Sequence, residues 1–162
     1  MRNFILLFVS LSLACGDTSR TCYPSDGIEE GTASLSLDGV SLTYDATWLM
    51  TGSSLQLNLD HDGSALTIRL SQSADGSSID ALGESSAEFS LGNPENGTAT
   101  FYPSDSASSA TIAADNPGSF TLSSFDQNTL TGCFSFIAEA QDGTSYEIST
   151  GLVNATESEL NQ

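Results

Sequence analysis

The chain has 162 residues, with 21 acidic side chains against three arginines and a formal net charge of −18. A polyanion with so few cations cannot neutralise phosphates, which excludes nucleic acid as a partner and makes an anionic membrane surface an unfavourable one. The apolar fraction of 38% is high enough for a packed core, so length and composition together predict one folded domain.

The first fourteen residues have the pattern of a secretory signal peptide. Arg2 is followed by an apolar run from Phe4 to Leu13 and then by the small residue Ala14. This run is much shorter than the roughly 20 apolar residues of a transmembrane helix. We therefore expect an exported protein from which residues 1–14 are removed.

The end of this segment, Leu11-Ser12-Leu13-Ala14-Cys15, resembles the lipobox of bacterial lipoproteins. The resemblance implies that Cys15 becomes the new N-terminus and carries acyl chains such as palmitate, which anchor the protein to the outer membrane of a bacterial cell envelope. In the usual lipobox an aliphatic residue precedes a small one, whereas Ser12 and Leu13 stand in the reverse order. The alternative is ordinary cleavage near Ala14 and a secreted protein.

The chain has three cysteines, Cys15, Cys22 and Cys133. An odd number in an exported protein implies a special use for one of them. If Cys15 is lipidated, Cys22 and Cys133 remain to form a disulfide in an oxidising compartment. Such a bond would close a loop of about 110 residues, for which the chain-entropy model gives up to about 4.7 kcal/mol. The alternative is two buried thiols that do not meet.

The remaining chain divides into a tether, a domain and a tail. Residues 15–31 are polar and contain Pro24 and an Asp-Gly pair, which is typical of a flexible tether. Residues 32–157 form the predicted domain, and residues 158–162 form a frayed tail.

Within the domain, apolar and polar residues alternate with a period of two, which predicts half-buried strands. Asp-Gly and Asn-Gly pairs separate several of these runs and favour tight hairpin turns. The expected fold is an all-β antiparallel β-sandwich of about eight to ten strands, with a closed β-barrel as the alternative. The predicted strands are 33–37, 40–44, 55–59, 66–70, 87–91, 98–102, 119–123, 129–138 and 145–154, while the Ser/Ala-rich stretch 104–114 is either a loop or an edge strand.

Three segments of the domain, Gly118–Leu122, Gly132–Ala138 and Tyr146–Gly151, resemble the C-terminal part of small uncharacterised β-sandwich lipoproteins of Bacteroidota-type bacteria. The likeness extends mainly over residues 96–156. It implies a cell-envelope lipoprotein, and no activity or cofactor is implied by it. Cys133 departs from the family pattern, in which threonine is usual, and this departure fits a disulfide to Cys22.

Candidate catalytic residues are few. His61 is the single histidine, the chain has no Gly-x-Ser-x-Gly motif, and the absence of lysine excludes Schiff-base chemistry. Carboxylates suitable for hydrolysis, such as Asp80, Glu84 and Glu88, cannot be told apart from a solvated acidic surface. We therefore expect a protein that is not an enzyme.

One stretch suggests a calcium site. Asn58, Asp60, Asp62 and Gly63 occupy the first, third, fifth and sixth positions of an EF-hand-like loop. The twelfth position should be a glutamate and is Arg69, so the only metal hypothesis is a looser calcium site on a hairpin turn.

Three large aromatic residues, Tyr44, Trp48 and Tyr102, are candidates for a sugar-binding platform, although such residues also form cores. The acidic surface favours a soluble monomer. The sequence thus predicts an exported, lipid-anchored cell-envelope protein with a structural or binding role and with a polysaccharide or an envelope protein as partner. The alternatives are a secreted adhesion or glycan-binding module and an envelope hydrolase that uses acidic residues.

Overall fold

The computed structural model describes residues 27–77, 79, 86–104, 108–113, 115–126 and 128–158. The expectations for residues 1–14, Cys15 and Cys22 therefore lie outside the described residues. Within them the chain forms strands β1 (Thr32–Leu37), β2 (Val40–Thr51), β3 (Ser54–His61), β4 (Ser64–Leu70), β5 (Ala87–Leu91), β6 (Gly97–Tyr102), β7 (Ala110–Ile112), β8 (Gly118–Phe125), β9 (Thr129–Ala140) and β10 (Ser145–Glu157). The Ser/Ala-rich stretch 104–114 was expected to be a loop or an edge strand, but it contains the short strand β7, which pairs with β6 on one side and β9 on the other and is therefore not an edge strand.

The strands close into an eight-stranded antiparallel barrel. Around the barrel the strands follow the order β1, β2, β3, β4, β6, β7, β9 and β10. The ring is closed because β1 pairs with both β2 and β10, and because β7 pairs with both β6 and β9. β8 and β5 lie outside the ring, because β8 pairs with the first half of β9 and β5 pairs with β8. The predicted all-β antiparallel fold is confirmed, and it takes the alternative form, a closed barrel, in place of the β-sandwich that was expected first.

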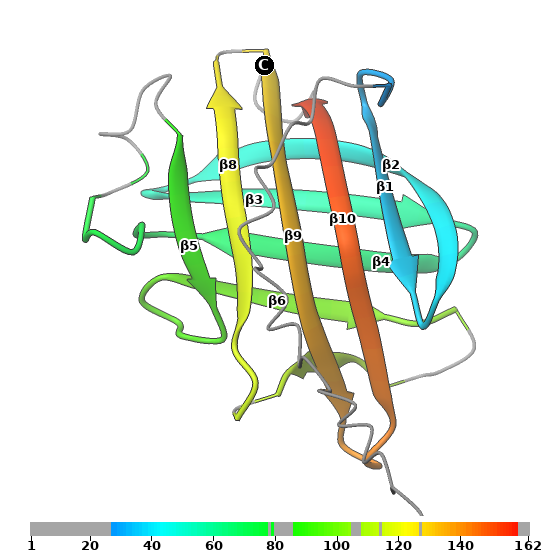
Figure 1. Ribbon diagram of the computed structural model, residues 1–162. Coiled ribbons are helices and arrows are strands. Elements are labelled where there is room, and N and C mark those ends of the chain that lie inside the picture. Colours follow the sequence, from blue (N-terminus) through cyan, green and yellow to red (C-terminus); the bar gives the residue numbers. More distant parts are fainter. Residues whose placement is uncertain are drawn as a thin grey trace, which may run out of the picture.

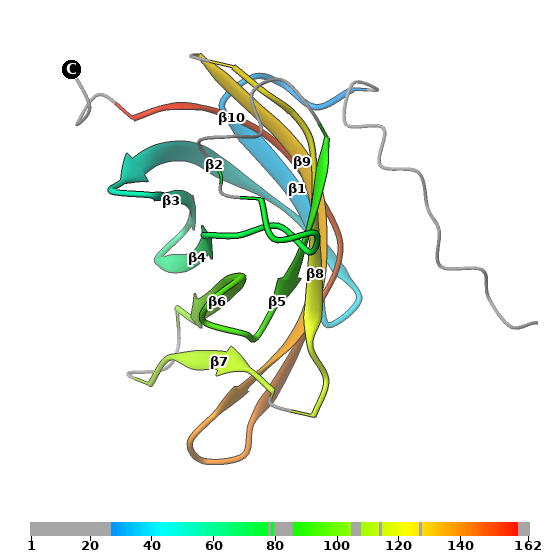
Figure 2. The ribbon, with the colours of Figure 1, turned by 90° about the vertical axis from the view of Figure 1, so that its left-hand side faces the viewer.

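The barrel has two walls whose strands run across one another (Figures 1 and 2). We call β5, β8, β9, β10 and β1 the first wall, and β2, β3, β4 and β6 the second wall. In the part of the chain that the structure describes, no helix is long and apolar enough to cross a membrane.

Two hairpin turns, one between the walls and one within the second wall, follow their local sequence. Asp38-Gly39 joins β1 to β2 and Asp62-Gly63 joins β3 to β4, and all four residues have φ between 42° and 83°. Consecutive positive φ angles are what a two-residue hairpin turn requires, and an aspartate followed by glycine adopts them at low cost.

The inner face of the second wall is regular and aliphatic. Six aliphatic residues of β3 and β4 alternate along the strands, point inward and are at most 1% exposed: Leu55, Leu57, Leu59, Leu66, Ile68 and Leu70. Complete burial of each such side chain contributes about 1.5–3 kcal/mol to folding.

The inner face of the first wall packs aromatic rings onto glycines. A Cβ atom added to Gly151 would lie 2.5 Å from the ring of Phe134, and one added to Gly132 would lie 2.9 Å from the ring of Phe120. The rings of Phe120 and Phe134 are parallel, with centroids 6.1 Å apart. The phenylalanines and glycines of segments 118–122, 132–138 and 146–151 therefore have a packing role.

Candidate functional site

An open hollow of about 310 Å³ lies where the β3–β4 hairpin meets β2. Two of the three predicted calcium ligands, Asp60 and Asp62, line it together with Asp45 and His61, but Asn58 does not. Asp60 lies directly opposite Asp45 in the sheet. This end of the second wall is therefore acidic and exposed.

The predicted calcium ligands are not brought together. The Oδ1 atom of Asn58 accepts hydrogen bonds from Gln56 Nε2 at 2.9 Å and from Thr67 Oγ1 at 3.4 Å, away from the hollow. Among the described residues no group of three His, Cys, Asp or Glu side chains is placed to hold a metal ion. The reason is the extended backbone. Asn58 and Asp60 lie two residues and about 7 Å apart within β3, whereas Asp62 lies on the hairpin turn.

His61 does not form a nucleophile–base pair with its nearest hydroxyl. Ser64 Oγ donates to the backbone carbonyl of His61 at 2.7 Å and accepts from Tyr44 OH at 3.1 Å. The imidazole instead packs on the Tyr44 ring at 5.1 Å, and its Nε2 lies 3.8 Å from Asp62 Oδ2. This arrangement stabilises the hairpin and leaves the serine without a base.

The predicted aromatic platform is not assembled. Tyr44 and Trp48 are 1% and 3% exposed, and Trp48 packs edge-on against Phe125 at 4.9 Å. Only Tyr102 is exposed, at 48%. The alternation of β2 directs residues 44, 46 and 48 into the barrel, whereas Tyr102 follows the inward Phe101 and so points out.

The outer face of the second wall is polar, and its residues are aligned in rows across β3, β4 and β6. Thr100 of β6 lies opposite Thr67 of β4, which lies opposite Asn58 of β3. In the next row Thr98, Arg69 and Gln56 are aligned in the same way. We call these six residues the polar face. They form no sequence motif, although the alternation in 55–59, 66–70 and 98–102 places them on one side of the strands.

Arg69 is the only lysine or arginine among the described residues. No carboxylate in that part of the chain forms an ion pair with it. Its Nη2 donates to Ser54 Oγ at 3.2 Å, and Ser54 Oγ lies 3.0 Å from Ser71 Oγ. The guanidinium is thus oriented by hydroxyls and keeps most of its donors available.

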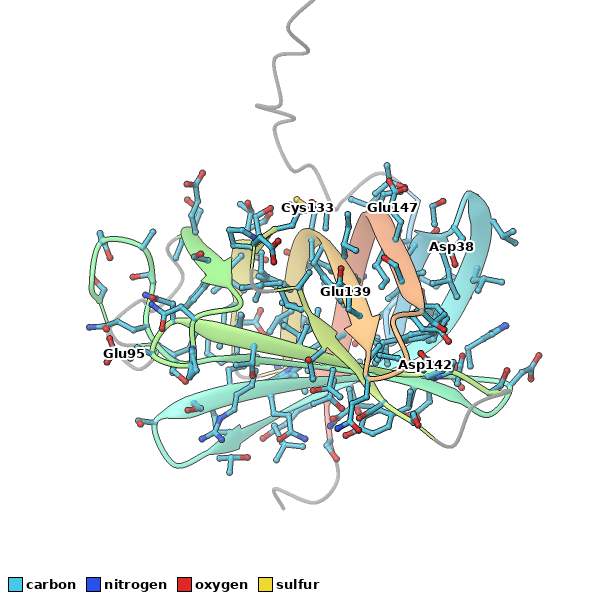
Figure 3. All side chains as sticks on the ribbon, turned by 90° about the horizontal axis from the view of Figure 1, so that it is seen from below. Asp38, Glu95, Cys133, Glu139, Asp142 and Glu147 are labelled. Atoms are coloured by element: carbon cyan, nitrogen blue, oxygen red, sulfur yellow. The ribbon has the colours of Figure 1, made fainter. Side chains whose placement is uncertain are left out.

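Cys133 lies on the outer face of the first wall, between Thr121 of β8 and Leu152 of β10 (Figure 3). It is disulfide-bonded. Its partner lies outside the described residues, as do the two other cysteines, Cys15 and Cys22.

The carboxylates with altered acidity have structural roles in turns. Hydrogen bonds from Ser73 Oγ and the Ser77 N–H lower the pKa of Asp75, and those from the Asn128 and Thr129 N–H groups lower the pKa of Asp126. Glu88, one of the candidate hydrolytic acids, is exposed on β5 opposite Thr121, and Asp80 and Glu84 lie outside the described residues. In the described part of the chain, no two carboxyl groups stand out as a pair in which one environment suits a proton donor and the other a nucleophile.

No protein-family model matches the chain, no curated protein matches it, and no solved structure matches it.

Proposed function

We propose that this is an exported, lipid-anchored protein of a bacterial cell envelope with a binding role. The observation that supports export is the disulfide at Cys133. Structural disulfides persist in oxidising compartments and are rare in the cytosol. The resemblance of residues 96–156 to envelope lipoproteins points to the same compartment.

Pairing of Cys133 with Cys22 leaves Cys15 for lipid, in agreement with the lipobox-like sequence before it. Several acyl chains on one residue give stable anchoring, whereas a single chain gives only marginal binding. In this proposal the barrel is held at the membrane by its N-terminus alone.

The test is the intact mass of the protein purified from its own host, with and without reductant and thiol alkylation. We expect a chain that begins at Cys15, carries acyl chains and exposes two thiols only after reduction. Cys15→Ser should move the protein out of the membrane fraction, and Thr43→Ser serves as a neutral control. An unacylated chain, or a Cys15→Ser variant that stays in the membrane, contradicts the anchor.

The ligand surface that the geometry favours is the polar face, and the ligand class is a neutral polysaccharide, because the net charge of −18 repels a polyanionic sugar as it does nucleic acid. The planar guanidinium of Arg69 offers several donors in a fixed geometry to the hydroxyl groups of a sugar ring. Gln56 and Thr67 both donate to Asn58 Oδ1, which leaves the two Asn58 amide N–H groups to donate to sugar hydroxyls. Tyr102, exposed beside this face, adds an apolar surface for a sugar ring.

Binding of neutral dextran and of a polyuronate tests this ligand class. We expect dextran to bind better than the polyuronate, and Arg69→Gln to weaken dextran binding by about tenfold or more, because a hydrogen bond from a charged group contributes about 1.5–3 kcal/mol. The matched control is Ser135→Ala on the outer face of the first wall, which should bind like the wild type. Equal binding by Arg69→Gln and wild type contradicts the site, and release of new sugar ends would favour the hydrolase.

A further inference from the structure

We infer that the outer face of the first wall around Cys133 is the docking surface for this chain's own residues 16–26, here called the arm. The arm then turns the first wall toward the membrane and the polar face away from it. The docking rests on the disulfide described above, and the orientation rests in addition on the proposed lipid at Cys15.

The disulfide restricts where the arm can run. Cys133 points out of the barrel from the middle of the first wall, and the only two other cysteines precede residue 27. A covalent bond from Cys133 therefore leads into the N-terminal segment and brings it onto this face.

The first described residues already lie at the edge of this surface. The backbone carbonyl of Ile28 accepts a hydrogen bond from Asn154 Nδ2 at 3.3 Å, and Asn154 is opposite Thr131, two residues before Cys133. Strand geometry puts Cys133 roughly 8 Å from Asn154. Because six residues separate Cys22 from Ile28 and span up to about 20 Å, Cys22 reaches Cys133 without strain.

One side chain of the arm is complementary in charge to this face, while Asp17 and Asp26 give the arm as a whole a net charge of −1. Arg20 is two residues from Cys22 and is the only cation of the arm. The outer face of the first wall exposes Glu88 and Glu147, and Glu88 shares a row with Thr121 and Cys133. Figure 3 shows Glu147 on the same outer side as Cys133. Arg20 carried across this face therefore meets carboxylates.

The docked arm determines the orientation of the barrel. Seven residues separate Cys15 from Cys22 and extend over at most about 25 Å, so the lipid stays close to the first wall. The polar face belongs to the opposite wall and is then open to ligands that approach from the side away from the membrane.

Arg20 and Arg69 are the two arginines that remain after residues 1–14 are removed. Cleavage of the chain after each of them serves as the measurement. Trypsin cleaves only after these residues, because lysine is absent. We expect cleavage after Arg20 to be about tenfold or more slower in the disulfide-bonded protein than in the Cys22→Ser/Cys133→Ser variant, because docking lowers the population of the open arm. Arg69 lies within β4 and reports on folding, since it is cleaved only if the barrel unfolds.

The orientation is measured on the acylated protein in vesicles with a membrane-impermeant arginine reagent. Arg69 should react at the same rate with and without vesicles, and Arg20 should react more slowly than Arg69. Equal tryptic cleavage after Arg20 in both forms overturns the docking. Protection of Arg69 by vesicles overturns the orientation, and an intact mass without acyl chains overturns the anchor while the tryptic result still decides the docking.

Discussion

The two walls of the barrel bury apolar surface in different ways. In the second wall, inward Leu and Ile side chains alternate without interruption along β3 and β4. In the first wall, Phe134 lies over Gly151 and Phe120 over Gly132, and the register of β10 shifts between Ile148 and Gly151. The first wall depends on particular shapes and on a covalent bond, whereas the second depends on a repeating pattern that leaves its outer side chains free to serve a ligand.

The largest effect should come from the disulfide of the first wall. Replacing Cys22 and Cys133 with serine is expected to lower the free energy of unfolding by about 4 kcal/mol, because the loop is long. Urea unfolding of the variant and of the wild type measures the difference. A change below about 1 kcal/mol would contradict a structural disulfide between these residues.

Gly151→Val should cost about 3 kcal/mol, since its side chain would overlap the Phe134 ring. The control is Thr98→Val, which introduces the same side chain at an outward strand position and should cost less than about 0.5 kcal/mol. Thermal unfolding of both variants shows whether the cost arises from the contact with the Phe134 ring. Similar costs would show that it does not.

Acid should weaken a turn of the first wall. The N–H groups of Asn128 and Thr129 lower the pKa of Asp126 below its ordinary value of 3.8. A carboxyl whose pKa is lower in the folded state stabilises the fold above the unfolded value, and this contribution is lost as the pH falls through the folded pKa. Between about pH 5 and pH 2 the melting temperature should fall more steeply for the wild type than for Asp126→Asn. Parallel curves would show that the turn does not contribute.

The smallest effect belongs to the acidic end of the second wall. Asp60 faces Asp45 directly, and like charges in this position repel. Asp60→Asn should stabilise the protein by about 0.5 kcal/mol at low salt, and salt should diminish the gain. Glu88→Gln is the control, because its cross-strand partner is Thr121. A loss of stability in Asp60→Asn would indicate a bound cation between the aspartates.

Much of the fold could be predicted because alternation and turn chemistry are local. The aspartate-glycine pairs at 38–39 and 62–63 form the expected hairpins, and the nine predicted strands lie within observed ones. The candidate site was less predictable. The sugar-platform hypothesis grouped Tyr44 and Trp48 with Tyr102 by residue type, whereas the strand period buries the first two and exposes the third.

By itself the sequence determined which segments are strands, which face of each strand is buried and where the hairpins turn, because these depend on neighbouring residues alone. Only the tertiary structure decided that β7 joins β6 to β9 and closes the barrel, that Phe134 packs on Gly151, and that Arg69 aligns with Gln56 and Thr98. These contacts join residues distant in the chain, and the pairing that satisfies their backbone hydrogen bonds and fills the core is a property of all the strands together.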